Sequence, residues 1–223
     1  MDETKLISAG SITDFESIKD RICYRLINRK SNSDLLCTIP HRNFHDLAII
    51  YYLSHTDGKT ETITNKLLKS WNTDKMSLYR HASKNSKHLH RGIVLTMFDV
   101  LESVTSGFPP QKCIMDAYDG FDVTRSRSDI LPAYVATNIT KTYGASIILY
   151  DGLLDAIAQK IGSFFAIPSS IHEFLLVPSK FGKLEELTEM VRDINATELH
   201  AEEVLSDNIY FYSAEDYKFK IIS

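Results

Sequence analysis

Residues 164–180 read FFAIPSSIHEFLLVPSK, the longest nearly uncharged apolar run in the chain, and a turn interrupts it. The segments Phe164–Ile167 and Ile171–Val177 are apolar, and Pro168-Ser169-Ser170 lies between them. Proline has no N–H to give a sheet, and serine hydroxyls satisfy local backbone groups. The pattern therefore predicts a strand, a tight turn and a second strand. Because both faces of the second strand are mostly apolar, we expect it to be central in its sheet and covered on both sides.

The same stretch holds the one compact polar cluster of the sequence: Ser169, Ser170, His172 and Glu173. Serine near histidine suggests a nucleophile and a base, but alternation along a strand puts His172 and Glu173 on opposite faces. Neither can then orient the other directly, and no G-x-S-x-G elbow is present. The interpretation that we prefer is structural: a serine turn whose polar groups His172 satisfies near the end of a sheet.

The bulk composition is that of an ordinary globular protein. Of the 223 residues, 43% are apolar and 24% are charged. A chain of this length buries roughly 70% of its unfolded surface, so it needs neither a disulfide nor a metal to fold. The net charge of −4 argues against a protein built mainly to hold nucleic acid.

Three features of the sequence predict a cytoplasmic protein. Cys23, Cys37 and Cys113 are widely spaced and form no C-x-x-C pair, which fits a reducing compartment. The first ten residues, MDETKLISAG, lack the apolar core of a signal peptide. No apolar run approaches the roughly 18 residues of a membrane span.

A hairpin followed by a helix is predicted in the N-terminal part. Asp46–Ser54 is rich in β-branched and aromatic residues, Asp57-Gly58 is a hairpin turn signal, and Thr60–Ile63 makes the return strand. Thr64 or Asn65 then caps a helix.

Later segments predict two further helices and a terminal hairpin. His88–Val104 has a wide apolar face at helical spacing, which predicts one long helix that is buried between layers or covered by a partner. Lys183–Ile194 is amphipathic. Strands 209–212 and 217–222 form the last hairpin, whose final strand alternates and should be an outer strand with one wet face.

The predicted domain division follows from one long irregular segment. Residues 105–132 contain Gly107, Pro109-Pro110 and Gly120, and structureless loops of this length are uncommon inside a compact domain. We therefore expect an N-terminal α+β half at 1–104, a linker at 105–132 and a C-terminal α+β half at 133–223.

The two halves are predicted to be related. Ala133–Asn138 and Ala145–Tyr150 suggest a second hairpin across Tyr143-Gly144, followed by a helix over 151–161. This unit aligns without a gap on the first hairpin and helix at an offset of 86 residues. The fold class expected is thus α+β, with two ββα-containing halves, mainly antiparallel sheet and helices packed on it. The alternative is two ordinary hairpins with similar turn residues.

Histidines offer no convincing metal site. His41-x3-His45 would share one helix face, but Pro40 and the following strand argue against a helix there. No acid or cysteine stands at a usual ligand spacing, and the phosphate-binding glycine motifs are absent. We expect no metal and no cofactor.

Residues 80–91 form a basic patch that includes Arg80, Lys84, Lys87 and His90. Such a patch could contact an anion or RNA, in which case binding should fall steeply with salt. We favour the simpler interpretation, a solvated helix junction. Nucleic acid is therefore a possible partner but not the favoured one.

Four segments of the chain resemble a family of bacterial proteins known as a domain of unknown function. They are CYRLINRKSNSDLLCTIPHRNFHDLAIIYY at 23–52, ITNKLLKSW at 63–71, FAIPSSIHEFLLVP at 165–178 and MVRDINATELHAEEVLSDNIYFY at 190–212. The order of hairpins and helices is more distantly similar to the YtpQ-like family. The resemblance implies the α+β fold, a bacterial origin and the cytoplasm. It supplies no catalytic residue.

The function that these observations favour is a non-enzymatic interaction module, an adaptor or inhibitor that binds another macromolecule, with a protein as the expected partner. No catalytic motif is visible, the 88–104 helix has surplus apolar surface, and tyrosines 210, 212 and 217 crowd the last hairpin. The alternative is an enzyme or small-ligand binder that uses the Ser169–Glu173 turn with Arg42 or His45 nearby. The sequence leaves open whether the protein is an enzyme, and it does not predict the oligomeric state.

Overall fold

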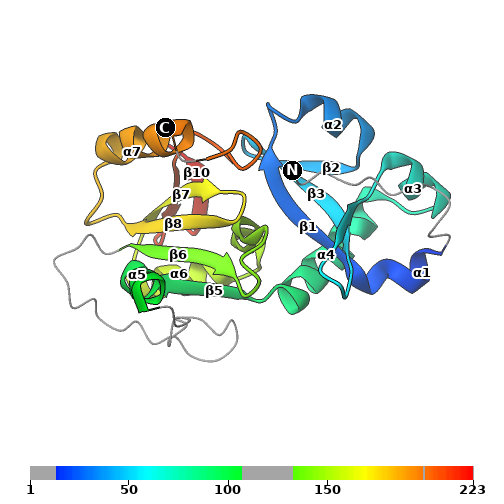
Figure 1. Cartoon of the computed structure of the whole chain (residues 1–223), viewed down its shortest axis with the longest axis horizontal. Helices are drawn as coiled ribbons and strands as arrows, with labels where there is room; N and C mark the ends of the chain where they lie inside the picture. The colour runs from blue at the N-terminus through cyan, green and yellow to red at the C-terminus, as the bar shows by residue number, and fades with distance from the viewer. Residues whose placement is uncertain (1–13, 107–132, 198, 223) are drawn as a thin grey trace. The chain divides into compact units, whose positions relative to one another are not determined.

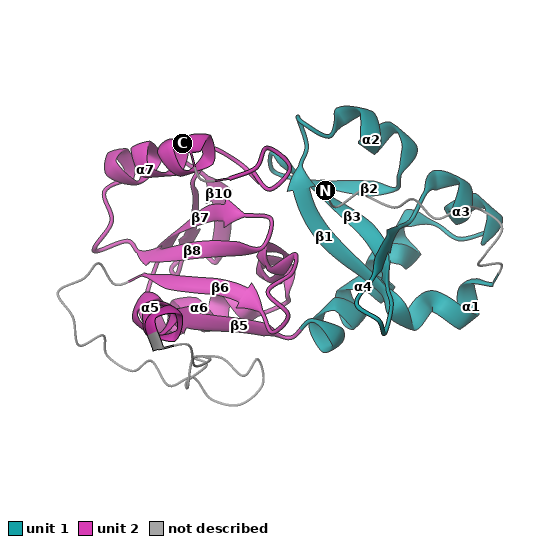
Figure 2. Cartoon of the chain, viewed as in Figure 1, with its two compact units in different colours: residues 1–90 teal, residues 91–223 magenta. Residues whose placement is uncertain are grey.

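The chain has an α+β fold with two antiparallel sheets (Figure 1). The computed structural model describes residues 14–106, 133–197 and 199–222. The chain divides into two compact units, unit 1 over residues 1–90 and unit 2 over residues 91–223 (Figure 2). None of the helices in the described ranges is long and apolar enough to cross a bilayer.

Unit 1 is organised around strand β3, which is buried along almost its whole length. On one edge β3 pairs with β1 from Ile22 opposite Leu53 to Asn28 opposite Leu47. On its other edge it pairs first with β2 and then with β4. The strands of unit 1 are β1 (Ile22–Asn28), β2 (His41–Phe44), β3 (Leu47–Ser54) and β4 (Thr60–Thr62).

Helices cover both faces of this sheet. On one face Leu36 of α2 packs with Ile27 and Ile50. On the opposite face Tyr79 of α4 stacks on Tyr24 with the ring centroids 6.3 Å apart. The helical segments of unit 1 are α1 (Phe15–Ile18), η1 (Lys19–Arg21), α2 (Ser33–Thr38), α3 (Asn65–Ser70) and α4 (Lys75–Leu89).

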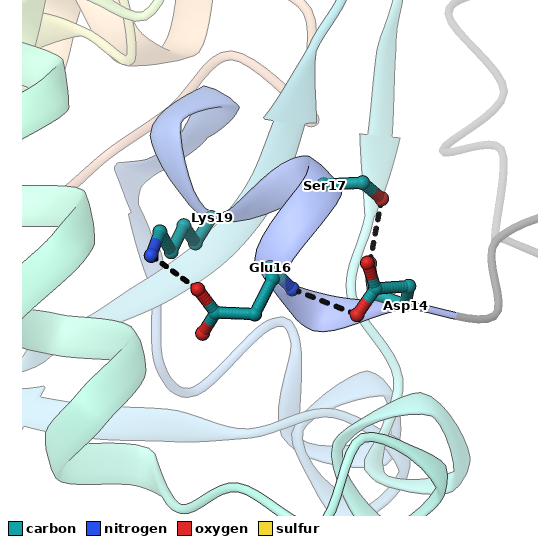
Figure 3. Close-up of polar contacts among 4 residues, drawn as sticks. All are labelled: Asp14, Glu16, Ser17 and Lys19. Atoms are coloured by element: carbon teal, nitrogen blue, oxygen red, sulfur yellow. Dashed lines mark hydrogen bonds and ion pairs between the residues drawn. The ribbon is translucent and has the colours of Figure 1, made fainter.

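Side-chain caps begin three of these helices. The Thr64 side chain accepts the N–H of Leu67 at α3, and the Asp74 carboxylate accepts the N–H of Ser77 at α4. At α1, Figure 3 shows Asp14 accepting the N–H of Glu16 and the ion pair between Glu16 and Lys19; Ser17 donates to the carbonyl oxygen of Asp14.

Unit 2 contains a six-stranded antiparallel sheet in the order β10-β9-β7-β8-β6-β5. The central strand β7 pairs with β8 along most of its length and with β9 over residues 164–166. The strands of unit 2 are β5 (Gly92–Thr96), β6 (Tyr134–Asn138), β7 (Phe164–Ser170), β8 (Glu173–Pro178), β9 (Tyr210–Ser213) and β10 (Lys218–Ile221).

The two faces of the unit 2 sheet are both covered. Ile167 and Val177 pack under Leu187 and Val191 of α7. On the other face Phe164 stacks on Tyr212, whose hydroxyl donates to the Asp155 carboxylate of α6. The expectation that β8 is central and covered on both sides is therefore confirmed. The helices of unit 2 are α5 (Met97–Ser106), the 3₁₀ helix η2 (Gly144–Leu149), α6 (Leu153–Ile161) and α7 (Leu184–Thr197).

The prediction of one long helix over 88–104 is wrong. Helix α4 ends at Leu89, and the segment continues as β5 and then α5. The apolar run Ile93-Val94-Leu95 pairs with Thr137-Ala136-Val135 of β6. A short, β-branched run suits a buried strand as well as a helix, and pairing with β6 decides between them.

The prediction of a second hairpin is also wrong, and the structure does not show the internal duplication. Strand β6 exists, but the expected return strand Ala145–Tyr150 contains η2 instead. Both edges of β6 are occupied, by β5 and by β8. No edge therefore remains on β6 for a return strand. The similarity between the two halves is limited to the turn glycine and the helix that follows it.

The turn between β7 and β8 lies later in the sequence than predicted. Pro168 lies inside β7 opposite Phe174, with a register shift before Ser170, so the turn falls at residues 171–172 rather than 168–170. Proline is tolerated there because β9 has already separated from that edge of β7.

The predicted linker, 105–132, lies outside the described residues except for 105 and 106, the end of α5.

Candidate functional site

The predicted polar cluster lies at the turn between β7 and β8. Ser170 is the last residue of β7, Glu173 is the first residue of β8, and the two are paired across the hairpin. Ile171 and His172 form the turn itself. The cluster is thus at one end of the unit 2 sheet, where backbone groups leave the strands and need other partners.

His172 is held by groups far away in the sequence. The backbone N–H of Tyr143 donates to His172 Nδ1 at 3.1 Å, and the Tyr143 ring stacks on the imidazole with the centroids 5.9 Å apart. Because Nδ1 accepts a hydrogen bond, the neutral ring carries its proton on Nε2. Glu203 Oε1 lies 3.9 Å from Nε2. The imidazole is therefore fixed on one nitrogen and faces a carboxylate with the other.

Glu203, rather than Glu173, is the carboxylate beside His172. The backbone N–H of Ile171 donates to the carbonyl oxygen of Glu203 at 2.9 Å, which brings the two segments together. Sequence reasoning missed Glu203 because it lies 31 positions after His172 and no local spacing relates them. His172 lies in the turn and not in β8, so the strand alternation used in the sequence argument about Glu173 does not apply to it.

Ser170 has a structural hydrogen bond. It is buried, and its Oγ accepts the backbone N–H of His172 at 3.0 Å, so the serine hydroxyl satisfies a backbone group of the turn. Ser169 is partly exposed. No described contact places either serine hydroxyl against the imidazole nitrogens, so the cluster does not form a serine–histidine pair.

A close approach of backbone segments stabilises this region. Thr137 Oγ1 donates to the carbonyl oxygen of His172 at 2.8 Å. A Cβ placed on Gly144 would lie 2.5 Å from that same oxygen and 2.7 Å from the backbone nitrogen of Asn138. Only glycine fits at residue 144, so the 3₁₀ helix η2 can pack directly against the turn.

Arg42 and His45 belong to unit 1. Arg42 lies on β2 with its guanidinium carbon 4.0 Å from the ring centroid of Tyr79, a cation–π contact. His45 follows β2 with φ 55°, and its ring meets the edge of Phe44 at 4.8 Å. Both side chains are exposed. The participation of Arg42 or His45 in the Ser169–Glu173 site remains a prediction.

Burial raises the pKa of two titratable groups in unit 1, Cys23 and Tyr51. Burial raises the pKa of the Cys23 thiol to about 12, which the hydrogen bond with Ser86 counteracts only in part. A thiol with so high a pKa is not a nucleophile at neutral pH. Burial also raises the pKa of Tyr51, whose hydroxyl has no hydrogen-bond partner among the described groups.

Within the described residues, no three His, Cys, Asp or Glu side chains are grouped so that they could hold a metal ion. The pair His41 and His45, considered from the sequence, is one example. His41 Nδ1 lies 3.2 Å from the carbonyl oxygen of Ile39, and His45 is in the tight turn after β2. A pair of histidines on a strand and a turn does not have the spacing of a helical metal motif.

A comparison with protein families identifies the family of this chain. The family model of DUF5688, described as a family of unknown function, matches residues 1–214. The chain belongs to the DUF5688 family. No curated protein and no solved structure matches it. Membership of DUF5688 confirms the resemblance to a domain of unknown function, whereas nothing in these comparisons supports the similarity to the YtpQ-like family.

Proposed function

We propose that this DUF5688 protein is an interaction module that binds a protein partner through helix α5. The carrying observation is a row of large apolar side chains on α5: Phe98 is 50% exposed, Leu101 48% and Val104 77%. They are three residues apart, so they follow one side of the helix. This row, Phe98–Leu101–Val104, is named the α5 row below.

The α5 row belongs to a well-anchored helix. Thr96 and Asp99 bond reciprocally at its start, with Thr96 Oγ1 accepting the N–H of Asp99 at 3.0 Å. Met97 packs against the unit 2 core under α7. The row is therefore presented by a fixed element, and covering three large apolar side chains stabilises a complex by roughly a few kcal/mol.

The tyrosines of the last hairpin give less support to this proposal than the sequence suggested. Tyr210 and Tyr212 are buried in the unit 2 sheet, so they are not available as contact residues. Tyr217 is 65% exposed and remains accessible at the end of the last hairpin. The support for a protein partner now rests on the α5 row, which falls inside the segment that the sequence singled out for its surplus apolar surface.

The test is affinity purification with matched variants. The full chain, a Phe98→Ser/Leu101→Ser variant and a Phe181→Ser/Ile139→Ser control would be used as bait in native extract. The control removes two apolar side chains of unit 2 that are similarly exposed, at 48% and 54%, but lie outside α5. We expect a stoichiometric partner on the wild type and on the control, and its loss on the α5 variant. Retention of the partner on the α5 variant would exclude this surface.

A second candidate function has one specific observation in its favour. The imidazole of His172 is oriented through Nδ1 and presents Nε2 beside Glu203, an arrangement that can move a proton to or from a bound small molecule. We therefore keep an enzyme or small-ligand binder at the Ser169–Glu173 turn as the alternative. Native mass spectrometry of wild type and His172→Gln would test it: a ligand lost only from the variant favours this alternative.

The cytoplasm is the compartment that we propose. Cys23 and Cys37, the cysteines in the described ranges, are free thiols, and Cys37 is exposed. An exposed free thiol is more compatible with a reducing compartment than with an oxidising one.

A further inference from the structure

Helix α4 in unit 1 has a strongly one-sided charge. Between residues 75 and 89 it contains four lysines and arginines and no aspartate or glutamate. The basic residues are Lys75, Arg80, Lys84 and Lys87. The nearest acid in sequence, Asp74, is the N-cap and uses its carboxylate to accept the N–H of Ser77. Nothing within α4 neutralises its positive charge.

Two of these cations, Arg80 and Lys84, lie in a row with His88 on the outer face of α4. Leu78, Ala82 and other buried residues mark the side that packs on the sheet. Arg80, Lys84 and His88 are four residues apart, so they share the opposite side at intervals of about 6 Å along the axis. All three are exposed, and none has an ion pair or hydrogen bond within the described structure. These three residues are named the α4 row below.

Arg42 adds a positive charge beside this helix. Its guanidinium is exposed and lies over the ring of Tyr79, which comes from α4. No carboxylate contacts Arg42 in the portion of the chain that the structure describes. Two of the acids of unit 1 pair with lysines outside α4: Glu16 with Lys19, and Asp57 with Lys59.

The net charge of the whole chain hides this asymmetry. Residues 1–90 contain 14 lysines and arginines against 10 aspartates and glutamates, whereas residues 91–223 contain 11 against 19. The acidic total of −4 thus combines a basic unit 1 with a strongly acidic unit 2. The overall charge, which argues against nucleic acid, does not describe the surface of unit 1.

We propose that the α4 row, with Arg42 beside it, binds the phosphate backbone of a nucleic acid. Arg80, Lys84 and Arg42 supply cations that have no ion pair in the described structure, and His88 adds a ring N–H donor. Phosphate contacts use such groups and need no base recognition. A protein partner would call for buried aromatic or aliphatic anchors at the centre of the contact, and the α4 row offers none. This binding is separate from the proposed function at α5.

The test is the salt dependence of binding to a fluorescein-labelled 20-nucleotide single-stranded RNA, with a DNA duplex of equal length in parallel. The full chain is compared with Arg80→Gln/Lys84→Gln and with the control Lys66→Gln/Lys69→Gln. The control removes two exposed charges of the same sign from α3, in the same unit. Binding is measured by fluorescence anisotropy between about 25 and 200 mM salt, the range over which phosphate contacts weaken strongly.

We expect the wild type to bind at least one of the two probes at low salt. The α4 variant should bind on the order of tenfold more weakly, with a salt slope reduced by roughly 1.4 for single strands. The control should keep the wild-type slope. The proposal is overturned if the wild type binds neither probe at low salt, or if the control loses as much affinity as the α4 variant, because charge alone would then explain the effect.

Discussion

Units 1 and 2 each consist of an antiparallel sheet with helices on both faces. They differ in whether certain polar side chains have hydrogen-bond partners within the chain. In unit 2 the hydroxyl of Tyr212 is bonded to Asp155, and the turn around His172 is closed by hydrogen bonds. In unit 1 the hydroxyl of Tyr51 is buried without such a partner, and Arg80 and Lys84 of α4 are exposed. The turn around His172 is thus hydrogen-bonded within the chain, whereas α5 exposes large apolar side chains and α4 exposes Arg80 and Lys84.

The largest difference is expected between two turn glycines. Gly144 in unit 2 has backbone atoms 2.5 and 2.7 Å from where a Cβ would be, whereas Gly58 in unit 1 has nothing within 4 Å and needs glycine only for its φ of +82°. We expect Gly144→Ala to lower the free energy of unfolding by about 3 kcal/mol or more. Gly58→Ala should cost about 1 kcal/mol. Urea unfolding monitored by circular dichroism measures both, and equal costs would contradict the close packing at the His172 turn.

The second difference concerns two buried tyrosines. Tyr212→Phe removes a hydroxyl that donates to Asp155, so we expect the protein to lose roughly 1–2 kcal/mol of stability. Tyr51→Phe removes a hydroxyl that is buried without a hydrogen-bond partner, so its stability should be unchanged or slightly higher. Thermal melts of the two variants distinguish these effects. A loss in Tyr51→Phe as large as that in Tyr212→Phe would show that the Tyr51 hydroxyl has a partner in solution.

A smaller effect should appear at alkaline pH. Burial raises the folded-state pKa of Tyr51 above the value of about 10 in the unfolded chain. Above about pH 10 the folded protein therefore keeps the Tyr51 proton while the unfolded chain releases it. The free energy of unfolding then falls as the pH rises, by up to about 1.4 kcal/mol per pH unit. Tyr51→Phe should make the stability curve flatter between about pH 9.5 and 11.

The control for this pH dependence is Tyr217→Phe, since the Tyr217 side chain is 65% exposed. Its curve should follow that of the wild type. If Tyr51→Phe and Tyr217→Phe give the same curve, the burial of Tyr51 does not govern the alkaline loss of stability.

Sequence reasoning succeeded where local signals suffice. The strand Asp46–Ser54, the turn at Asp57-Gly58 and the return strand correspond to β3 and β4, and Thr64 caps α3 as expected. The amphipathic helix and the terminal hairpin correspond to α7, β9 and β10, and the edge strand β10 exposes Lys218 and Lys220 to solvent. In each case the signal, whether a turn residue, a cap or an alternation, lies within a few consecutive residues.

The same reasoning failed where distant segments decide. Residues 92–96 become a strand because β6 pairs with them, and Ala145–Tyr150 cannot join the sheet because both edges of β6 are taken. At the candidate site Ser170 and His172 were found from the sequence, but the Tyr143 N–H, Gly144 and Glu203 were not. These groups meet through tertiary contacts across roughly 30 residues, which no local spacing encodes.

The central claim is that the α5 row holds a protein partner by apolar contact, and a salt series on the captured complex tests it most directly. The partner would be captured on the full chain, on Phe98→Ser/Leu101→Ser and on the Phe181→Ser/Ile139→Ser control, then washed with increasing salt up to about 0.5 M, where exposed charges are largely screened. We predict that the partner stays on the wild type and the control throughout and is absent from the α5 variant. A partner that high salt releases from the wild type, or that the α5 variant retains, would contradict the account.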